Sequence, residues 1–82
     1  MGNAMMKERP EYLRRIRILR KSRSLTQKQV ASFLGTSQTM YARYERGANE
    51  LPIHHLQKLR ELYHVSADFL LGNTGDLPDR GN

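Results

Sequence analysis

The stretch QKQVASFLGTSQTMYARYERG, residues 27–47, decides the fold of this 82-residue chain. Thr26 and Gln29 have the Ser/Thr-x-x-Glu/Gln spacing of a capping box, so a helix is expected to start at about Gln27. That helix should end at Gly35, because glycine adopts the left-handed conformation of a helix C-cap at the lowest cost. Two hydroxyl residues follow the glycine and can cap a second helix. The stretch therefore predicts two short helices that meet at a tight turn.

The second helix, expected over about residues 37–46, has a polar outer face. In the major groove of DNA, glutamine pairs with adenine, arginine pairs with guanine, and an apolar side chain can contact a thymine methyl group. Thr39 and Arg43 are four residues apart and so share a face of the helix. The side chains expected to contact bases are Gln38, Thr39, Met40 and Arg43. The alternative is an ordinary solvated helix surface, on which Arg43 forms a salt bridge.

Five short motifs follow one another along the chain, namely Leu25-Thr26-Gln27, Val30-Ala31, Leu34-Gly35, Tyr44-Glu45-Arg46-Gly47 and the segment VSADFLLG at residues 65–72. Together they resemble the helix-turn-helix of the Cro and phage-repressor family of bacterial regulators, the xenobiotic-response-element type. The similarity covers about residues 13–72. It implies an all-α fold, a compact five-helix bundle of the lambda-repressor-like kind. It also implies sequence-specific binding of double-stranded DNA, with the second helix of the motif in the major groove and repression as the outcome.

The resemblance assigns roles to residues outside the base-contacting face. Gln27 stands where a glutamine of the family holds a DNA phosphate, and the N-terminus of a helix favours anions. Further candidates for phosphate contacts are Thr36, Arg46 and Tyr41, the last only if its hydroxyl reaches the surface. The family usually places a branched aliphatic residue at the position of Tyr41, and a tyrosine there needs a partner for its hydroxyl.

A first helix is expected to begin at Pro10, a residue suited to the first turn. Its inward face carries Leu13, Ile16, Leu19 and Arg20, and its opposite face carries Arg14, Arg15, Arg17 and Lys21. The opposite face is therefore basic, and it is either solvated or close to phosphates. An arginine among inward positions needs a partner, and the family pattern pairs Arg20 with Glu45 as a structural ion pair.

The rest of the chain completes one small domain. Pro52 should begin a fourth helix whose inward residues are Ile53, Leu56, Leu59, Leu62 and Tyr63. Ser66 is the expected N-cap of a short fifth helix that Gly72 ends. The domain is expected over residues 10–72, between a flexible N-terminal tail at 1–9 and a disordered C-terminal tail at 73–82.

The chain is basic, with a formal net charge of +6 that is concentrated in its first 25 residues. Eight Lys and Arg residues and two Glu residues in that segment give a net charge of +6 there. Such an asymmetry suggests a polyanion as partner, and the plainer alternative is a solvated basic face. There is no cysteine, which fits a reducing cytoplasm. We see no apolar run of membrane-spanning length and no signal-peptide pattern, so a cytoplasmic location is expected.

Catalysis and metal binding find no support in the sequence. His54 and His55 are adjacent and would point about 100° apart on a helix, and no cysteine is present to assist them. These two residues and His64 are therefore expected at the surface or its edge. No carboxylate pair, nucleophile constellation or glycine-rich phosphate loop is visible. The chain is expected not to be an enzyme and to need no cofactor and no metal ion.

Two kinds of protein partner remain open. A homodimer is expected at least on DNA, because one recognition helix reads only a few base pairs. Its contact surface is expected near Leu51, Phe69 and Leu70. The alternative function comes from another class, an antitoxin or interaction domain that acts chiefly through a protein partner such as a toxin.

Overall fold

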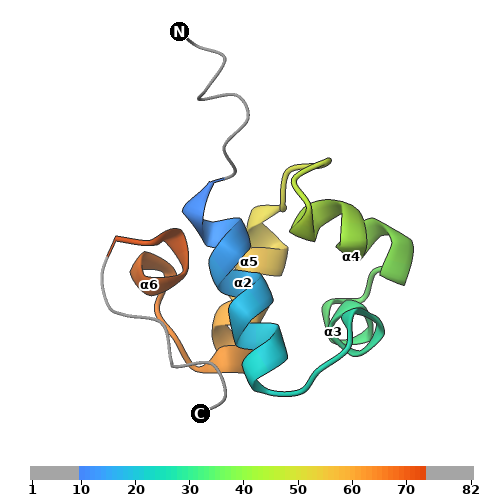
Figure 1. Cartoon of the computed structure of the whole chain (residues 1–82), viewed down its shortest axis with the longest axis horizontal. Helices are drawn as coiled ribbons and strands as arrows, with labels where there is room; N and C mark the ends of the chain where they lie inside the picture. The colour runs from blue at the N-terminus through green and yellow to red at the C-terminus, as the bar shows by residue number, and fades with distance from the viewer. Residues whose placement is uncertain (1–9, 74–82) are drawn as a thin grey trace, which may run out of the picture.

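The computed structural model describes residues 10–73, and this part of the chain forms five helices and no strand (Figure 1). The helices are α2 (Glu11–Ser22), α3 (Gln27–Leu34), α4 (Gln38–Glu45), α5 (Ile53–Tyr63) and α6 (Ala67–Leu71). α3 packs against α4, α2 contacts both α4 and α6, and α5 contacts both α3 and α6. The expected all-α five-helix bundle is thus confirmed. Apart from Asn73, the two expected tails lie outside the described residues.

Local hydrogen bonds set the boundaries of α3 and α4 where the sequence predicts them. The Thr26 hydroxyl accepts a hydrogen bond from the backbone N–H of Gln29 at 3.0 Å, and the Gln29 side chain accepts one from the Thr26 N–H at 2.8 Å. Gly35 ends α3 with a φ of +79°. The Ser37 hydroxyl then accepts from the backbone N–H of Met40 at 3.0 Å and starts α4. The turn between the two helices is therefore encoded by these few residues.

All five helices contribute to one hydrophobic core. Its buried members are Leu13, Ile16, Leu19, Val30, Ala31, Leu34, Tyr41, Tyr44, Leu59, Tyr63 and Leu70. The aliphatic residues come from α2, α3, α5 and α6, whereas α4 supplies two tyrosines. A domain of this size buries only about 60% of the unfolded chain's surface, less than a larger domain does, so each specific polar contact has a large share in its stability.

The buried face of α5 differs from the expected one. Ile53 is 72% exposed, whereas His55 is only 6% exposed. The buried residues follow steps of four, His55, Leu59 and Tyr63, and Ile53 lies about 160° around the helix from His55. The His55 ring packs edge-on against Tyr44 of α4, with ring centroids 5.6 Å apart. The expectations of an inward Ile53 and a surface His55 are therefore wrong, because Tyr44 packs on the side of α5 that carries His55, about 160° around the helix from Ile53.

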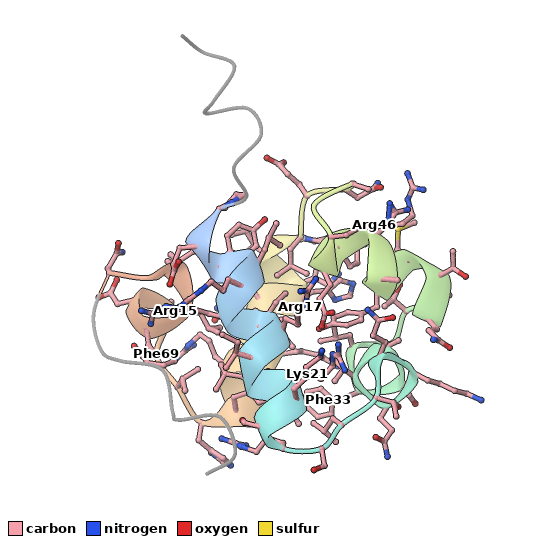
Figure 2. The ribbon with its side chains drawn as sticks, viewed as in Figure 1. Arg15, Arg17, Lys21, Phe33, Arg46 and Phe69 are labelled. Atoms are coloured by element: carbon pink, nitrogen blue, oxygen red, sulfur yellow. The ribbon has the colours of Figure 1, made fainter. Side chains whose placement is uncertain are left out.

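The sequence suggested that Arg15 belongs to the basic face of α2, but the structure places it elsewhere. Its side chain is buried against α6 (Figure 2), where its Nη1 donates to the Phe69 carbonyl oxygen at 2.8 Å. Its guanidinium lies 4.7 Å from the centre of the Phe69 ring, and its Nε bonds Glu11 Oε2 at 2.9 Å. Arg15 therefore joins α2 to α6, because it occupies the side of α2 that α6 covers.

The position of Leu70 in α6 removes one residue from the expected dimer surface. Leu70 is fully buried in the core of the domain. A residue that already packs against its own chain has no surface to offer a second copy. Phe69 and Leu51 are partly exposed and partly packed on the core.

Candidate nucleic-acid interface

The first turn of α4 presents an open polar face. Gln38 and Thr39 are exposed, and the Ser37 cap fixes the start of the helix directly before them. Met40 is half-buried and packs partly against the core, so only part of its side chain is available. Arg43 is half-buried, and its Nε donates to Asn49 Oδ1 at 2.7 Å. Gln38, Thr39 and Arg43 all lie on α4, and Thr39 and Arg43 are about one helical turn apart.

The inner side of α4 is fixed by the carboxylate of Glu45, the last residue of the helix. This side chain is only 3% exposed and accepts hydrogen bonds from three helices. Arg20 of α2 donates to it through Nε at 2.7 Å and through Nη2 at 3.1 Å. Tyr41 donates its hydroxyl proton at 2.7 Å, and Gln27 Nε2 of α3 donates at 3.0 Å. Arg20 and Glu45, which the resemblance pairs, therefore form the centre of a buried network, the Glu45 cluster.

The electrostatics of the Glu45 cluster favour the ionised pair. Burial alone raises the pKa of Glu45, but hydrogen bonds from Arg20, Tyr41 and Gln27 outweigh it and hold that pKa below its ordinary value of 4.5. The same hydrogen bond to Glu45 raises the pKa of Arg20. Burial also raises the pKa of the Tyr41 hydroxyl, and the neighbouring Glu45 carboxylate adds to this shift. The two charges thus stabilise each other, and the hydroxyl remains a neutral donor.

The cluster changes the set of expected phosphate contacts. Tyr41 was a phosphate candidate only if its hydroxyl reached the surface, and that condition is not met, because Tyr41 is fully buried and its hydroxyl donates to Glu45. Gln27 is half-buried and one N–H of its side-chain amide is used by Glu45. Within residues 10–73 the backbone N–H groups of Gln27 and Lys28 have no acceptor, so the start of α3 keeps two free donors. Thr36 is half-buried and Arg46 is exposed.

Two cations flank this network on α2. Arg17 and Lys21 are exposed and lie one helical turn apart; Lys21 directly follows Arg20 in the sequence, and Arg17 precedes it by three residues. Figure 2 shows both on the side of α2 that is turned toward α3 and α4. Among the described residues neither has a hydrogen bond or an ion pair, and the same holds for the Arg46 side chain. Because Arg20 already neutralises Glu45, the charges of these three residues are uncompensated nearby.

The sequence did not reveal two contacts that shape this surface. The hydrogen bond between Tyr41 and Glu45 has the i, i+4 spacing of a helical pair and could have been found from that spacing. The hydrogen bond between Arg43 and Asn49 crosses a loop, and no spacing rule gives it. In the described part of the chain there is no group of residues that could hold a metal ion, and no helix is long and apolar enough to cross a membrane.

Comparison with known proteins agrees with this geometry. Residues 16–70 match the family model described as helix-turn-helix. The chain is 41% identical over 68 residues to the HTH-type transcriptional regulator YobD of Bacillus subtilis (strain 168), which covers 83% of this chain and 60% of that protein. It is 38% identical over 60 residues to the SPbeta prophage-derived HTH-type transcriptional regulator YonR of the same organism, which covers 73% of this chain and 56% of that protein.

The chain therefore belongs to the helix-turn-helix family, and the resemblance noted in the sequence is confirmed. It spans 60% and 56% of the lengths of the two named relatives. No solved structure matches it.

Removal of the Arg20 guanidinium should destabilise the fold strongly. Arg20→Ala leaves the Glu45 carboxylate buried without its counter-ion, and breaking a buried pair from one side costs about 3–5 kcal/mol. The control is Arg14→Ala, which removes an exposed pair with Glu11 at 3.0 Å and should cost about 0–1 kcal/mol. Thermal unfolding followed by circular dichroism measures both. Equal melting temperatures for the two variants would show that the buried pair does not hold the helices together.

Acid should weaken the fold through Glu45. Since the pKa of Glu45 is depressed in the folded state, the ionised carboxylate stabilises the fold above its unfolded pKa and loses that effect as the pH falls through the folded one. The free energy of unfolding of wild type and of Glu45→Gln should therefore differ most near pH 7, and the difference should start to shrink as the pH falls below about 4.3, the unfolded pKa of a glutamate. Urea unfolding between pH 7 and pH 3 measures this, with the exposed Glu61→Gln as control. A gap that is independent of pH would contradict the assignment.

Proposed function

We propose that the protein is a sequence-specific regulator of transcription that binds double-stranded DNA with α4 in the major groove. The observation that carries this proposal is the exposed polar face of α4, formed by Gln38 and Thr39 with Arg43 one turn further on. Its inner side is held by the Glu45 cluster, so the face has a fixed direction. Membership of the helix-turn-helix family supports the proposal, as do the relatives named as transcriptional regulators.

Gln38, Thr39 and Arg43 are the proposed base contacts. A glutamine amide forms two hydrogen bonds with adenine, and a guanidinium forms two with guanine. Met40 has a lesser role, an apolar contact with a thymine methyl through the part of its side chain that the core leaves free. Gln38, Thr39 and Met40 lie in the first turn of α4, and the N-terminal residues of a recognition helix are those that contact base edges, while Arg43 lies one turn further on.

Phosphate contacts are proposed for the rim of this face. The free N–H groups at the start of α3 and the partly used amide of Gln27 can hold one phosphate. Arg46 and Thr36 are the other candidates near α4, and Arg17 and Lys21 extend the cationic rim onto α2. Phosphate contacts of this kind supply a large share of the affinity, whereas base contacts supply the preference for a sequence.

A homodimer on DNA and repression complete the proposal. A two-fold dimer reads two half-sites about 34–36 Å apart, one helical turn of the duplex. With Leu70 buried, the partly exposed Leu51 and Phe69 remain as candidates for the contact between the copies. A dimer bound over a promoter hinders the polymerase, so repression is the proposed outcome.

Selection of bound sequences from a random duplex pool, followed by salt titration, tests the proposal. The selected site should show dyad symmetry, and log K should fall by about 0.9 per neutralised phosphate as log[salt] rises. The double variant Arg17→Ala/Lys21→Ala should reduce this slope by about two such steps, while Lys58→Ala on α5 should not. Absence of duplex binding at low salt would contradict DNA binding and favour a function through a protein partner.

Variants of the base-contacting residues should differ from variants of the phosphate-contacting residues in how their DNA affinity depends on sequence. Gln38→Ala and Arg43→Ala should each weaken binding to the selected site by about 1–3 kcal/mol and flatten the preference at one base pair per half-site. Gln27→Ala should weaken binding to all sequences about equally, because phosphates carry no sequence. A binding profile across single-base changes of the site distinguishes these patterns. If Gln38→Ala and Arg43→Ala lose affinity uniformly, those residues hold the backbone and not the bases.

A further inference from the structure

The loop after α4 follows a path that its backbone fixes. Gly47 has a φ of +83°, and its N–H donates to the Tyr44 carbonyl oxygen at 3.1 Å. The Ala48 N–H donates to the Arg43 carbonyl oxygen at 2.9 Å, which completes the two hydrogen bonds of a Schellman motif. A Cβ atom at position 47 would lie 3.1 Å from Leu13 Cδ1, so the loop passes close to this buried side chain of α2. The chain is thereby turned back over the last turns of α4.

This course of the loop brings Asn49 into contact with Arg43. The Asn49 N–H donates to the Arg43 carbonyl oxygen at 3.3 Å, and its Oδ1 accepts from Arg43 Nε at 2.7 Å. A guanidinium is a donor only, so the carbonyl end of the amide must face it. Both the backbone and the side chain of Asn49 are therefore bound to the same residue of α4.

The contact leaves the far end of Arg43 free. Its Nη1 and Nη2 carry four N–H groups, and within residues 10–73 none of them has an acceptor. Because the guanidinium is planar, fixing Nε also fixes the plane and direction of these donors. A side chain held in this way loses less rotational freedom when it binds than a mobile arginine would lose.

We propose that Asn49 is a positioning residue that aims the Nη1 and Nη2 donors of Arg43 at a guanine. The inference rests on the proposed function, and it adds a determinant of sequence preference that lies outside the recognition helix. With Nε occupied, Arg43 meets the O6 and N7 acceptors of guanine end-on, through its two terminal nitrogens. Asn49 acts through Arg43, and the Gly47 turn places Asn49 there.

The contact with Asn49 predicts how variants change base preference. Asn49→Ala should reduce the preference for guanine at the position read by Arg43 by about three- to tenfold, a part of the roughly 5- to 150-fold that a complete bidentate contact supplies. Asn49→Asp keeps an acceptor oxygen for Nε. It should therefore keep the preference while its added charge lowers affinity for all sequences. Asn49→Ala/Arg43→Ala should show the same preference as Arg43→Ala alone, because the effect of Asn49 passes through Arg43.

Competition binding between the selected duplex and its single-base variants measures these preferences. The matched control is Gln57→Ala, which removes another amide acceptor from an arginine, Arg60 Nη1 at 2.8 Å, on the exposed surface of α5. Binding is compared after circular dichroism shows each variant to be folded. A preference that Asn49→Ala leaves intact, or a loss that adds to that of Arg43→Ala, would overturn the proposal.

A measurement without DNA separates this proposal from DNA binding itself. In the nitrogen-15 NMR spectrum of the free protein, the Arg43 Nε–H should exchange slowly with water in wild type and in Asn49→Asp. The same signal should exchange fast in Asn49→Ala. Fast exchange in wild type would show that Asn49 does not hold Arg43 and would overturn the inference even if the protein binds DNA. A protein that shows slow exchange and binds no duplex would contradict the proposed function and, with it, the role of Asn49 in base preference.

Discussion

The buried carboxylate of Glu45 is the constraint on which the arrangement of α2, α3 and α4 depends. A charge with 3% exposure is costly unless it is paired and hydrogen-bonded, and here Arg20, Tyr41 and Gln27 supply the donors. Each donor fixes one relation in space. Arg20 sets α2 against α4, Gln27 sets α3 against α4, and Tyr41 stiffens α4 itself. Rotation of α2 or α4 would separate the ion pair, and rotation of α3 would remove a hydrogen bond from the buried carboxylate, so the network specifies a single packing.

That single packing is what gives the outer face of α4 its direction. Tyr41 and Tyr44 are side chains of α4 that pack into the core, whereas Gln38 and Thr39 of the same helix are exposed. Because the charge of Arg20 is used inside, the positive charge on the surface comes from residues such as Arg17, Lys21 and Arg46. The molecule therefore separates its charges by role. The buried Arg20 and Arg15 hold helices together, and the exposed cations remain available to a polyanion.

The helix ends could be predicted from the sequence, because they depend on residues close by in the chain. The burial of individual side chains could not, because it depends on how the helices pack. Thr26, Gly35 and Ser37 determine helix ends through bonds within a few residues, so these ends could be predicted. The pair of Arg20 and Glu45 came from the family resemblance, since a separation of 25 residues follows from no local rule. Ile53, His55 and Arg15 were misplaced because periodicity gives the angle between residues and not the side on which a neighbouring helix lies. Asn49 was missed because its contact depends on the course of a loop.

An NMR titration of the nitrogen-15-labelled protein with its selected duplex tests most directly whether the face fixed by Glu45 is the one that meets DNA. The account predicts the largest shift changes at the amides of Gln38 and Thr39, at the Nε–H of Arg43, and at the first amides of α3. The Arg20 Nε–H should change little, since its bond to Glu45 is buried and already formed in the free protein. Changes confined to α5 and α6, with the α4 amides unmoved at saturation, would contradict it.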